Sequence, residues 1–260
     1  MMSDGAMSYI MRDHIHKMIE NNQRIDGRTR EEFRKITVET GYVNRAEGSA
    51  MVSLGDTRVL AGVKSIVGEP FPDTPDRGVL TTNAELIPLA SETFESGPPK
   101  QGSIELARVV DRGIREGQAV DFQKLCLKPG EEVCINFVDI HALDYDGNLF
   151  DAANIAAVSA LKSAVIPASR FDKGEDYPFP MKHIPISATF AKIAGHLVAD
   201  PTFDEENVAS ARLTVVTIET GKLCAMQKGL GGSFLRPEVE KAIELSMEFG
   251  KKVRAQVFHM

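Results

Sequence analysis

The sequence lacks several features that would assign it at once to a class of protein. It has no tryptophan, three cysteines among 260 residues, and no uninterrupted apolar run of the length that spans a membrane, about eighteen residues. The odd number of cysteines, without CxxC spacing, argues against a disulfide framework. Cys126 and Cys134 lie in apolar surroundings typical of buried thiols in a reducing compartment. The six histidines are scattered, so we expect no zinc or iron site.

Positive charge is also scarce. Lysine and arginine number 30 against 37 acidic residues, which gives a net charge of −7 at pH 7. This balance excludes a surface coated for general nucleic-acid binding, so any RNA site must concentrate its positive charge or share a partner's. Near the N-terminus Asp13, Lys17 and Glu20 interrupt the apolar residues, unlike the apolar core of a secretory signal. We therefore expect a cytoplasmic protein.

Apolar spacing predicts helices and strands in alternation. Expected helices cover residues 8–21, 103–120, 148–165 and 237–253. Expected extended segments are 36–40, a hairpin over 48–63 that turns at Gly55-Asp56, 82–88, 133–143, 186–193, 197–199, 212–218 and 222–227. In the second helix Ser103 is the expected N-cap, and the expected inner face is Ile104, Ala107, Val110 and Ile114.

The pattern also predicts two halves. The segment Gly48–Val52 before the Gly55-Asp56 turn is similar to Ala209–Leu213 before a Thr220-Gly221 turn, and a long helix follows each. A polar, proline-containing connection over 167–185 separates these segments. We predict an N-terminal helix over 1–23, a first domain over 24–180 and a second over 181–260.

Three arginines form the sharpest local pattern. Arg108, Arg112 and Arg115 are spaced i, i+4, i+7, so they share one face of the predicted helix. Such a stripe can contact successive phosphates of a single strand. It is more typical of a solvated face whose ion-pair partners would be Glu105, Asp111 and Glu116. The spacing alone therefore favours the solvated face, because charged helix faces are common on any soluble protein.

Two further clusters could either bind a ligand or have no functional role. Asp200, Asp204, Glu205 and Glu206 could hold Mg²⁺ or supply a general acid, or they could form a solvated loop. Gly229–Ser233 could bind a phosphate before a helix, but it matches neither GxGxxG nor the P-loop, so a flexible loop is favoured.

Several segments resemble the RNase PH superfamily, which degrades RNA from the 3′ end by phosphorolysis. These are Arg24-Ile25-Asp26-Gly27-Arg28, Gly48–Val63, Ile104–Gly113 and Val133–Val165. The resemblance covers roughly residues 24–255 and is strongest to the larger RNase PH-like ring subunit of the archaeal exosome. It implies an α+β RNase PH-like fold of two similar β-sheet-plus-helix halves with βαβ-like repeats, the first half similar to ribosomal protein S5 domain 2.

The sequence departs from active members of that family at three places. The segment Asp146–Asp151 lacks the hydroxyl and arginine pair of their phosphate site. Pro98–Ser103 keeps one cation, Lys100, where they carry paired arginines. Ser210–Thr214 lacks their carboxylates, with Arg212 in place of one. Phosphorolysis needs an anion site, cations and an acid, so the resemblance implies a subunit with no catalytic residue and no metal of its own.

The resemblance also implies the partners. A catalytic paralogue would form a heterodimer with this chain, three heterodimers would form a ring, and RNA-binding cap subunits would cover it. The chain would need no cofactor, because inorganic phosphate and Mg²⁺ would bind at the partner's active site. Single-stranded RNA would contact Arg108, Arg112 and Arg115.

Two other functions stay open. The chain could itself be an active phosphorolytic exoribonuclease that uses Glu206 and the residues 200–205. It could also be a small-molecule enzyme on a related scaffold, with a nucleotide at Gly229–Ser233.

Overall fold

Two antiparallel-rich sheets form the frame of the molecule. The computed structural model describes residues 4–260, with the backbone alone for residues 4–8. The first sheet has the order β1 (Ile36–Thr40), β2 (Gly48–Leu54), β3 (Thr57–Gly68), β6 (Glu132–Asp144), β4 (Val79–Leu86), with β5 (Cys126–Lys128) also paired to β6. Only the β4–β6 pair in this sheet is parallel.

The second sheet is smaller and antiparallel throughout. Its order is β10 (His196–Ala199), β9 (Ile186–Ile193), β11 (Ala211–Thr217), β12 (Leu223–Gly229). A short ribbon of β7 (Val165–Ile166) and β8 (Tyr177–Pro178) and two 3₁₀ turns, Phe122–Leu125 and Ala168–Phe171, complete the connections.

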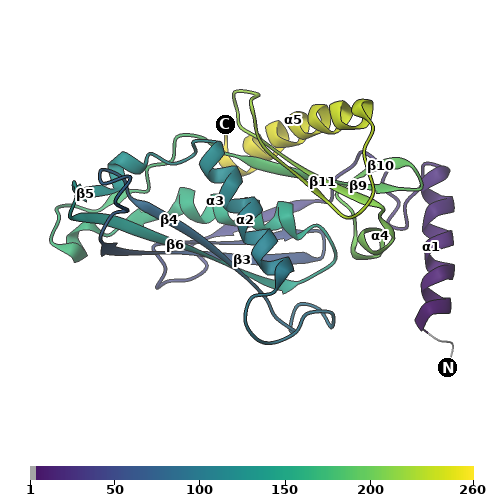
Figure 1. Ribbon diagram of the computed structural model, residues 1–260, viewed down its shortest axis with the longest axis horizontal. Helices are drawn as coiled ribbons and strands as arrows, with labels where there is room; N and C mark the ends of the chain where they lie inside the picture. Colours follow the sequence, from purple (N-terminus) through teal and green to yellow (C-terminus); the bar gives the residue numbers. More distant parts are fainter. Residues whose placement is uncertain (1–3) are drawn as a thin grey trace.

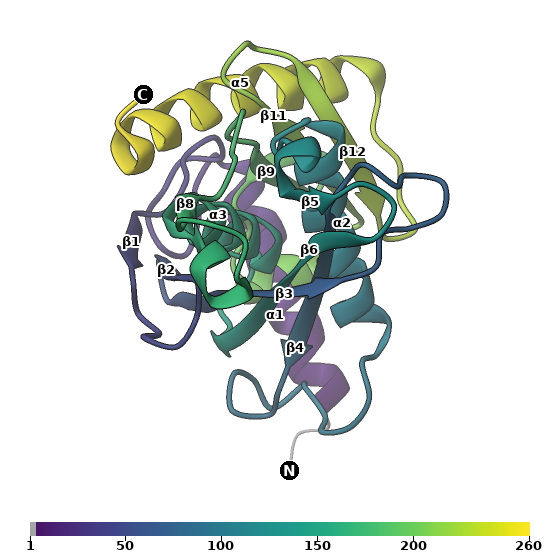
Figure 2. The same cartoon turned by 90° about the vertical axis from the view of Figure 1, so that its left-hand side faces the viewer.

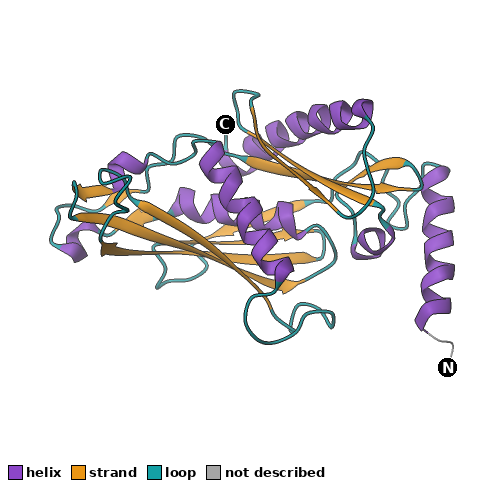
Figure 3. Ribbon diagram, in the orientation of Figure 1, coloured by secondary structure: helices purple, strands orange, loops and turns teal. Residues whose placement is uncertain are grey.

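Two helices lie between the sheets and a third covers the outside of the second sheet (Figure 1). The inner pair is α2 (Gln101–Glu116) and α3 (Leu149–Ser163), and the outer helix is α5 (Arg236–Phe258). The turned view has α5 across the top, with α2 and α3 between it and β3 (Figure 2). The remaining helices, α1 (Asp4–Glu20) and α4 (Phe203–Val208), lie at the end of the second sheet (Figure 3).

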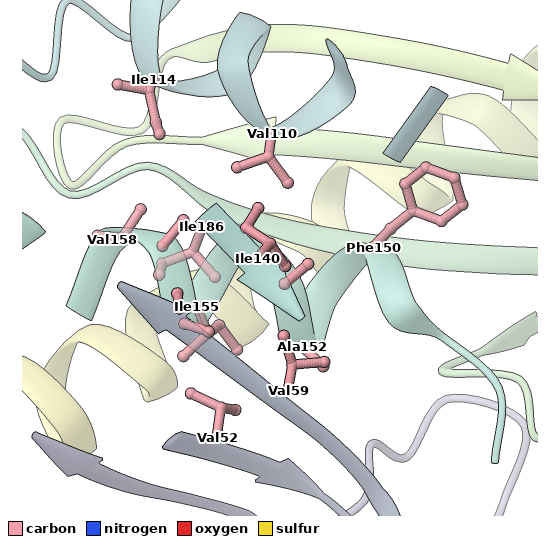
Figure 4. Close-up of a cluster of buried hydrophobic side chains, with 14 of the residues drawn as sticks. Val52, Val59, Val110, Ile114, Ile140, Phe150, Ala152, Ile155, Val158 and Ile186 are labelled. Carbon is pink, nitrogen blue, oxygen red and sulfur yellow. The ribbon is translucent and has the colours of Figure 1, made fainter. Parts of the chain in front are cut away.

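Helix α3 is buried on all sides, which explains its composition. It packs against β2 and β3 of one sheet and β9 of the other. A helix between two sheets has no solvated face, so its sequence is rich in small apolar residues all round. Ile155 and Ala152 of α3 lie near Val52 and Val59 of the first sheet in the core shown in Figure 4.

Several element boundaries differ from those predicted. Helix α2 begins at Gln101 and ends at Glu116, and its N-cap is Lys100; Ser103 lies in the first turn and donates to the Lys100 carbonyl. Ala107, Val110 and Ile114 of the predicted inner face are buried, but Ile104 is 48% exposed, because the buried stripe continues through Leu106 and Val109.

Only part of the apolar face of the N-terminal helix is buried. Ile15 and Ile19 are buried against Ile193 and Val198 of the second sheet, but Tyr9 and Ile10 are exposed. Among the free cysteines, Cys134 is buried as predicted and Cys126 is half-buried. No helix in the described part of the chain is long and apolar enough to cross a membrane.

The close approach of β2 to α3 predicts a matched pair of variants. A Cβ at Gly48 would lie 2.3 Å from the Ala160 carbonyl oxygen, whereas a Cβ at Gly62 has no atom within 4 Å. We expect Gly48→Ala to lower the free energy of unfolding by about 1–3 kcal/mol through overpacking. Gly62→Ala, one strand away, should change it by less than about 1 kcal/mol in the same urea titration. Equal values for the two variants would contradict the packing described here.

Candidate nucleic-acid interface

The exposed side of α2 carries all three predicted arginines. The buried stripe of this helix holds it between α3 and the sheets, so Arg108, Arg112 and Arg115 face away from the core. Together with residues of β11 and β12 they line an open cavity of about 670 Å³. The far wall includes Thr214 and Lys228. The structure therefore brings the three arginines to one hollow surface.

The three arginines are not equivalent. Arg115 donates from Nε to Asp111 Oδ2 at 2.6 Å and from its terminal nitrogen to the Leu80 carbonyl, and it lies over the Phe122 ring. Arg108 and Arg112 make no hydrogen bond or ion pair with any residue in the described part of the chain. Two guanidinium groups thus remain available to a ligand.

The three acidic residues near the stripe have different partners. Of the three partners that spacing suggested, only Asp111 bonds to an arginine of the stripe. Glu105 instead forms an ion pair with Arg212 of β11, with 2.7 Å between Oε1 and Nη2. The interpretation of α2 as a solvated face held by internal ion pairs therefore fits Arg115 alone.

The start of α3 is occupied by the chain's own acceptors. Asn148 adopts a left-handed conformation, with φ of 53°, and its side chain accepts from the Asp151 amide. The Asn148 amide donates to Glu206 Oε1 at 3.0 Å. A helix N-terminus attracts anions through such free amides. Here two of them already have partners inside the protein.

Asp151 is fully buried at this helix start. Its carboxylate accepts hydrogen bonds from the side chains of Asn148, Ser187 and Thr189 and from the Thr189 amide, at 2.8–2.9 Å. Burial raises the pKa of Asp151 to about 6, and these hydrogen bonds offset only part of that effect. The group ties α3 to β9 inside the core.

The acidic cluster does not form a metal site. Asp204, Glu205 and Glu206 belong to helix α4 and not to a loop, and each carboxylate has a different environment. Glu205 binds Arg24, and Asp200 binds Arg28 and Arg34. In the described part of the chain, no group of three or more histidine, cysteine or acidic side chains could hold a metal ion.

Glu206 differs from its neighbours because its partner is a phenol. Tyr145 donates to Glu206 Oε2 at 2.5 Å, and burial raises the pKa of this carboxyl despite the bond. Burial and the Glu206 carboxylate in turn raise the pKa of Tyr145. Sequence reasoning missed this pair, since the two residues are far apart in the chain and no local pattern links them.

The arginines of the opening segment were also missed as structural residues. Arg24 is buried and donates from Nε and Nη2 to the two oxygens of Glu205, at 2.8 and 2.6 Å. Burial alone would raise the pKa of Asp200, but its bonds to Arg34 and the charge of Arg28 lower it. The sequence signal for these ion pairs was an arginine-rich segment and a separate acidic cluster. That signal does not show which arginine pairs with which carboxylate.

The glycine loop after β12 is fastened to the protein through one of its amides. Leu230 has a positive φ of 63°, and the Gly232 amide donates to the Ser210 carbonyl at 2.8 Å. This bond fastens the loop to the strand connection before β11. The segment Gly229–Ser233 is thus a turn held by the protein, of the kind expected when no phosphate motif is present.

Comparison with known proteins agrees with this architecture. The family model described as "3′ exoribonuclease family, domain 1" matches residues 32–167, and that described as "3′ exoribonuclease family, domain 2" matches residues 183–248. The chain belongs to this family, also called RNase PH.

Curated relatives match nearly the whole chain. "Exosome complex component Rrp42" of Thermococcus gammatolerans is 53% identical, over 97% of this chain and 96% of the relative. The protein of the same name from Methanocella arvoryzae is 49% identical, over 98% of both.

Solved structures confirm the predicted α+β RNase PH-like fold. A chain of the Archaeoglobus fulgidus exosome with RNA bound to the active site has a TM-score of 0.94 and 48% identity, over 96% of this chain and 99% of that one. A chain of an archaeal exosome core has a TM-score of 0.90 and 44% identity, over 98% and 99%. Rice Rrp46, at 18% identity and a TM-score of 0.69, over 91% and 100%, shares the fold.

The environment of Asp151 predicts a pH dependence of stability. Its pKa is about 6 in the folded state against 3.8 for the free side chain, so the folded state binds the proton more tightly. The resulting stability is fully present below pH 3.8 and is lost as the pH rises through about 6.

Asp151→Asn provides the reference that does not titrate. We expect the free energy of unfolding of the wild type to rise relative to this variant by up to about 3 kcal/mol between pH 7 and pH 4. Both proteins keep Asp200, so the difference reports Asp151 together with its charge coupling to Asp200. A flat difference in denaturant titrations across this range would show that Asp151 titrates normally.

Proposed function

We propose that this chain is a ring subunit of an archaeal exosome that binds single-stranded RNA without performing the phosphorolysis itself. Its similarity to exosome components named Rrp42, over almost the full length of each, supports the assignment to that complex. The similarity to a chain of an exosome with RNA bound to the active site supports a role next to RNA.

The occupied N-terminus of α3 carries the non-catalytic part of this proposal. An attacking phosphate needs free amides and cations, and here the amides at Asn148 and Asp151 bond to the chain's own acceptors. The Glu206 carboxylate beside them would repel a phosphate dianion. The single cation of the segment before α2, Lys100, forms an ion pair with Glu95.

The segment expected to carry the catalytic acid supports the same conclusion. Arg212 lies in β11, and the residues around it, Ala211, Leu213 and Thr214, have no carboxylate. Glu206, the candidate acid of an active exoribonuclease, is bonded to Tyr145 and to the Asn148 amide. Its bonds hold it within the protein instead of leaving it free to protonate a leaving oxygen.

The proposed assembly follows from this division of labour. A catalytic paralogue would supply the phosphate site and the acid, with inorganic phosphate and Mg²⁺ bound there. It would pair with this chain, three pairs would form a six-membered ring, and RNA-binding cap subunits would cover the ring. We place the assembly in the cytoplasm. Nucleoside diphosphates would be released from RNA 3′ ends.

The RNA surface in this proposal is the cavity beside α2. Arg108 and Arg112 are exposed one turn apart and have no internal partner in the described part of the chain, so their charge is available to successive phosphates. Arg115 is bonded to Asp111 and Leu80, and its proposed role is to extend the positive surface from a fixed position.

The first experiment separates a supporting from a catalytic subunit. The purified chain, given single-stranded RNA, inorganic phosphate and Mg²⁺, should release no nucleoside diphosphate above background, measured by thin-layer chromatography of end-labelled RNA. The same preparation mixed with the catalytic paralogue should release it. Product from the chain alone would overturn the non-catalytic assignment, and the variant Glu206→Gln would then test the acid.

The second experiment tests the arginine stripe. In the assembled ring, we expect Arg112→Ala to weaken RNA binding and to reduce the slope of log K against log salt by about one, since one phosphate contact is lost. Lys251→Ala, an exposed cation on α5, is the matched control and should leave both unchanged. Fluorescence anisotropy without inorganic phosphate measures binding without turnover. An unchanged slope for Arg112→Ala would refute the assignment.

A further inference from the structure

Arg212 lies directly behind the wall of the α2 cavity. Glu105 and Gly229 line the cavity, but Arg212 does not. Its Nη2 is 2.7 Å from Glu105 Oε1, and a Cβ added to Gly229 would lie 2.7 Å from the same nitrogen. The side chain is 17% exposed, so it reaches the cavity through Glu105 and not by its own surface.

The guanidinium is held in this place by packing as well as by charge. Its central carbon lies 4.2 Å from the centroid of the Phe150 ring, which belongs to the first turn of α3 (Figure 4). A cation over an aromatic face gains from the ring's negative electrostatic potential. Arg212 of β11 therefore contacts α2, α3 and β12 together, through Glu105, Phe150 and Gly229.

The charges of the cavity explain why this contact matters for RNA. The lining contains four cationic side chains and three carboxylates: Arg108, Arg112, Arg115, Lys228, and Glu105, Asp111, Glu116. Asp111 is neutralised by Arg115 within the lining. Glu105, next to Arg108 on the same helix, is neutralised by Arg212, which lies outside the lining. Glu116, at the far end of the helix, makes no ion pair in the described part of the chain.

We propose that Arg212 is a positioning residue for RNA binding: it neutralises Glu105 and holds it against the wall of the cavity, so that RNA phosphates meet Arg108 without the opposing charge of Glu105. This role rests on the RNA function proposed above. The charge of Arg212 thus acts on the surface of α2 through Glu105.

The test removes the two charges singly and together in the ring assembled with the catalytic paralogue. Binding of a 5′-labelled oligoadenylate is measured by anisotropy at several salt concentrations without inorganic phosphate. We expect Arg212→Met to weaken binding about 3- to 10-fold at low salt, because it exposes an unpaired carboxylate near the phosphates. Glu105→Gln should bind at least as tightly as the wild type.

The double variant distinguishes charge from packing. Glu105→Gln with Arg212→Met should bind RNA within about twofold of the wild type, because the opposing charge is gone. A double variant as weak as Arg212→Met would overturn the proposal and assign the loss to packing. Arg212→Lys keeps the charge without the planar stacking group, so it should bind like the wild type, and a loss as large as that of Arg212→Met would also contradict the proposal.

Arg112→Ala, measured beside these variants, distinguishes a failure of the proposed RNA surface from a failure of the proposed role of Arg212. If Arg112→Ala weakens binding and Arg212→Met does not, the role of Arg212 is wrong and the RNA surface stands. If neither variant changes binding, the RNA surface is wrong and the role of Arg212 falls with it. Gel filtration of the ring and thermal unfolding confirm that each variant folds and assembles. If Arg212→Met does not assemble, the binding of Arg212→Lys and Glu105→Gln tests the role of Arg212.

Discussion

The ion-pair network around Asp200 and Glu205 joins parts of the chain that are far apart in the sequence. Arg24 and Arg34 come from the segment before the first strand, whereas both carboxylates come from the end of β10 and from α4. Each arginine also bonds to backbone carbonyls, such as those of Ala199 and Asp146. Buried charges are tolerated only when they are paired and fully hydrogen-bonded, and this network meets both conditions.

The network also determines the chemistry available at the start of α3. Asp200 accepts from the Asn148 side chain as well as from the arginines, and Asn148 in turn accepts from the Asp151 amide. The turn before α3 is therefore held by Asp200 and Asn148, which belong to the buried ion-pair network. Glu206 completes this arrangement from α4, through the Asn148 amide. The N-terminus of α3 could bind an anion if its amides were free, but here these amides bond to groups that hold the two sheets together.

Local patterns predicted the elements but not their partners. The Gly55-Asp56 turn and the helix α3 follow from residues close in sequence, and both were predicted correctly. Ile104 was misplaced, because the helical stripe that faces the core is chosen by two sheets whose positions no local spacing contains. The placement of Arg108 and Arg112 on one exposed face could be predicted. The pairing of Glu105 with Arg212 could not, since it depends on how β11 crosses α2.

The position of α3 has a mechanical consequence. Helix α3 packs against both sheets. Its first turn is bonded to β9 through Asp151, and the rest of the helix packs on β2 and β3. Motion about a hinge between the halves would have to break this shared core, so the subunit moves as one rigid body. In the proposed ring, any change in the ring's diameter would then come from rotation at the boundaries between neighbouring subunits.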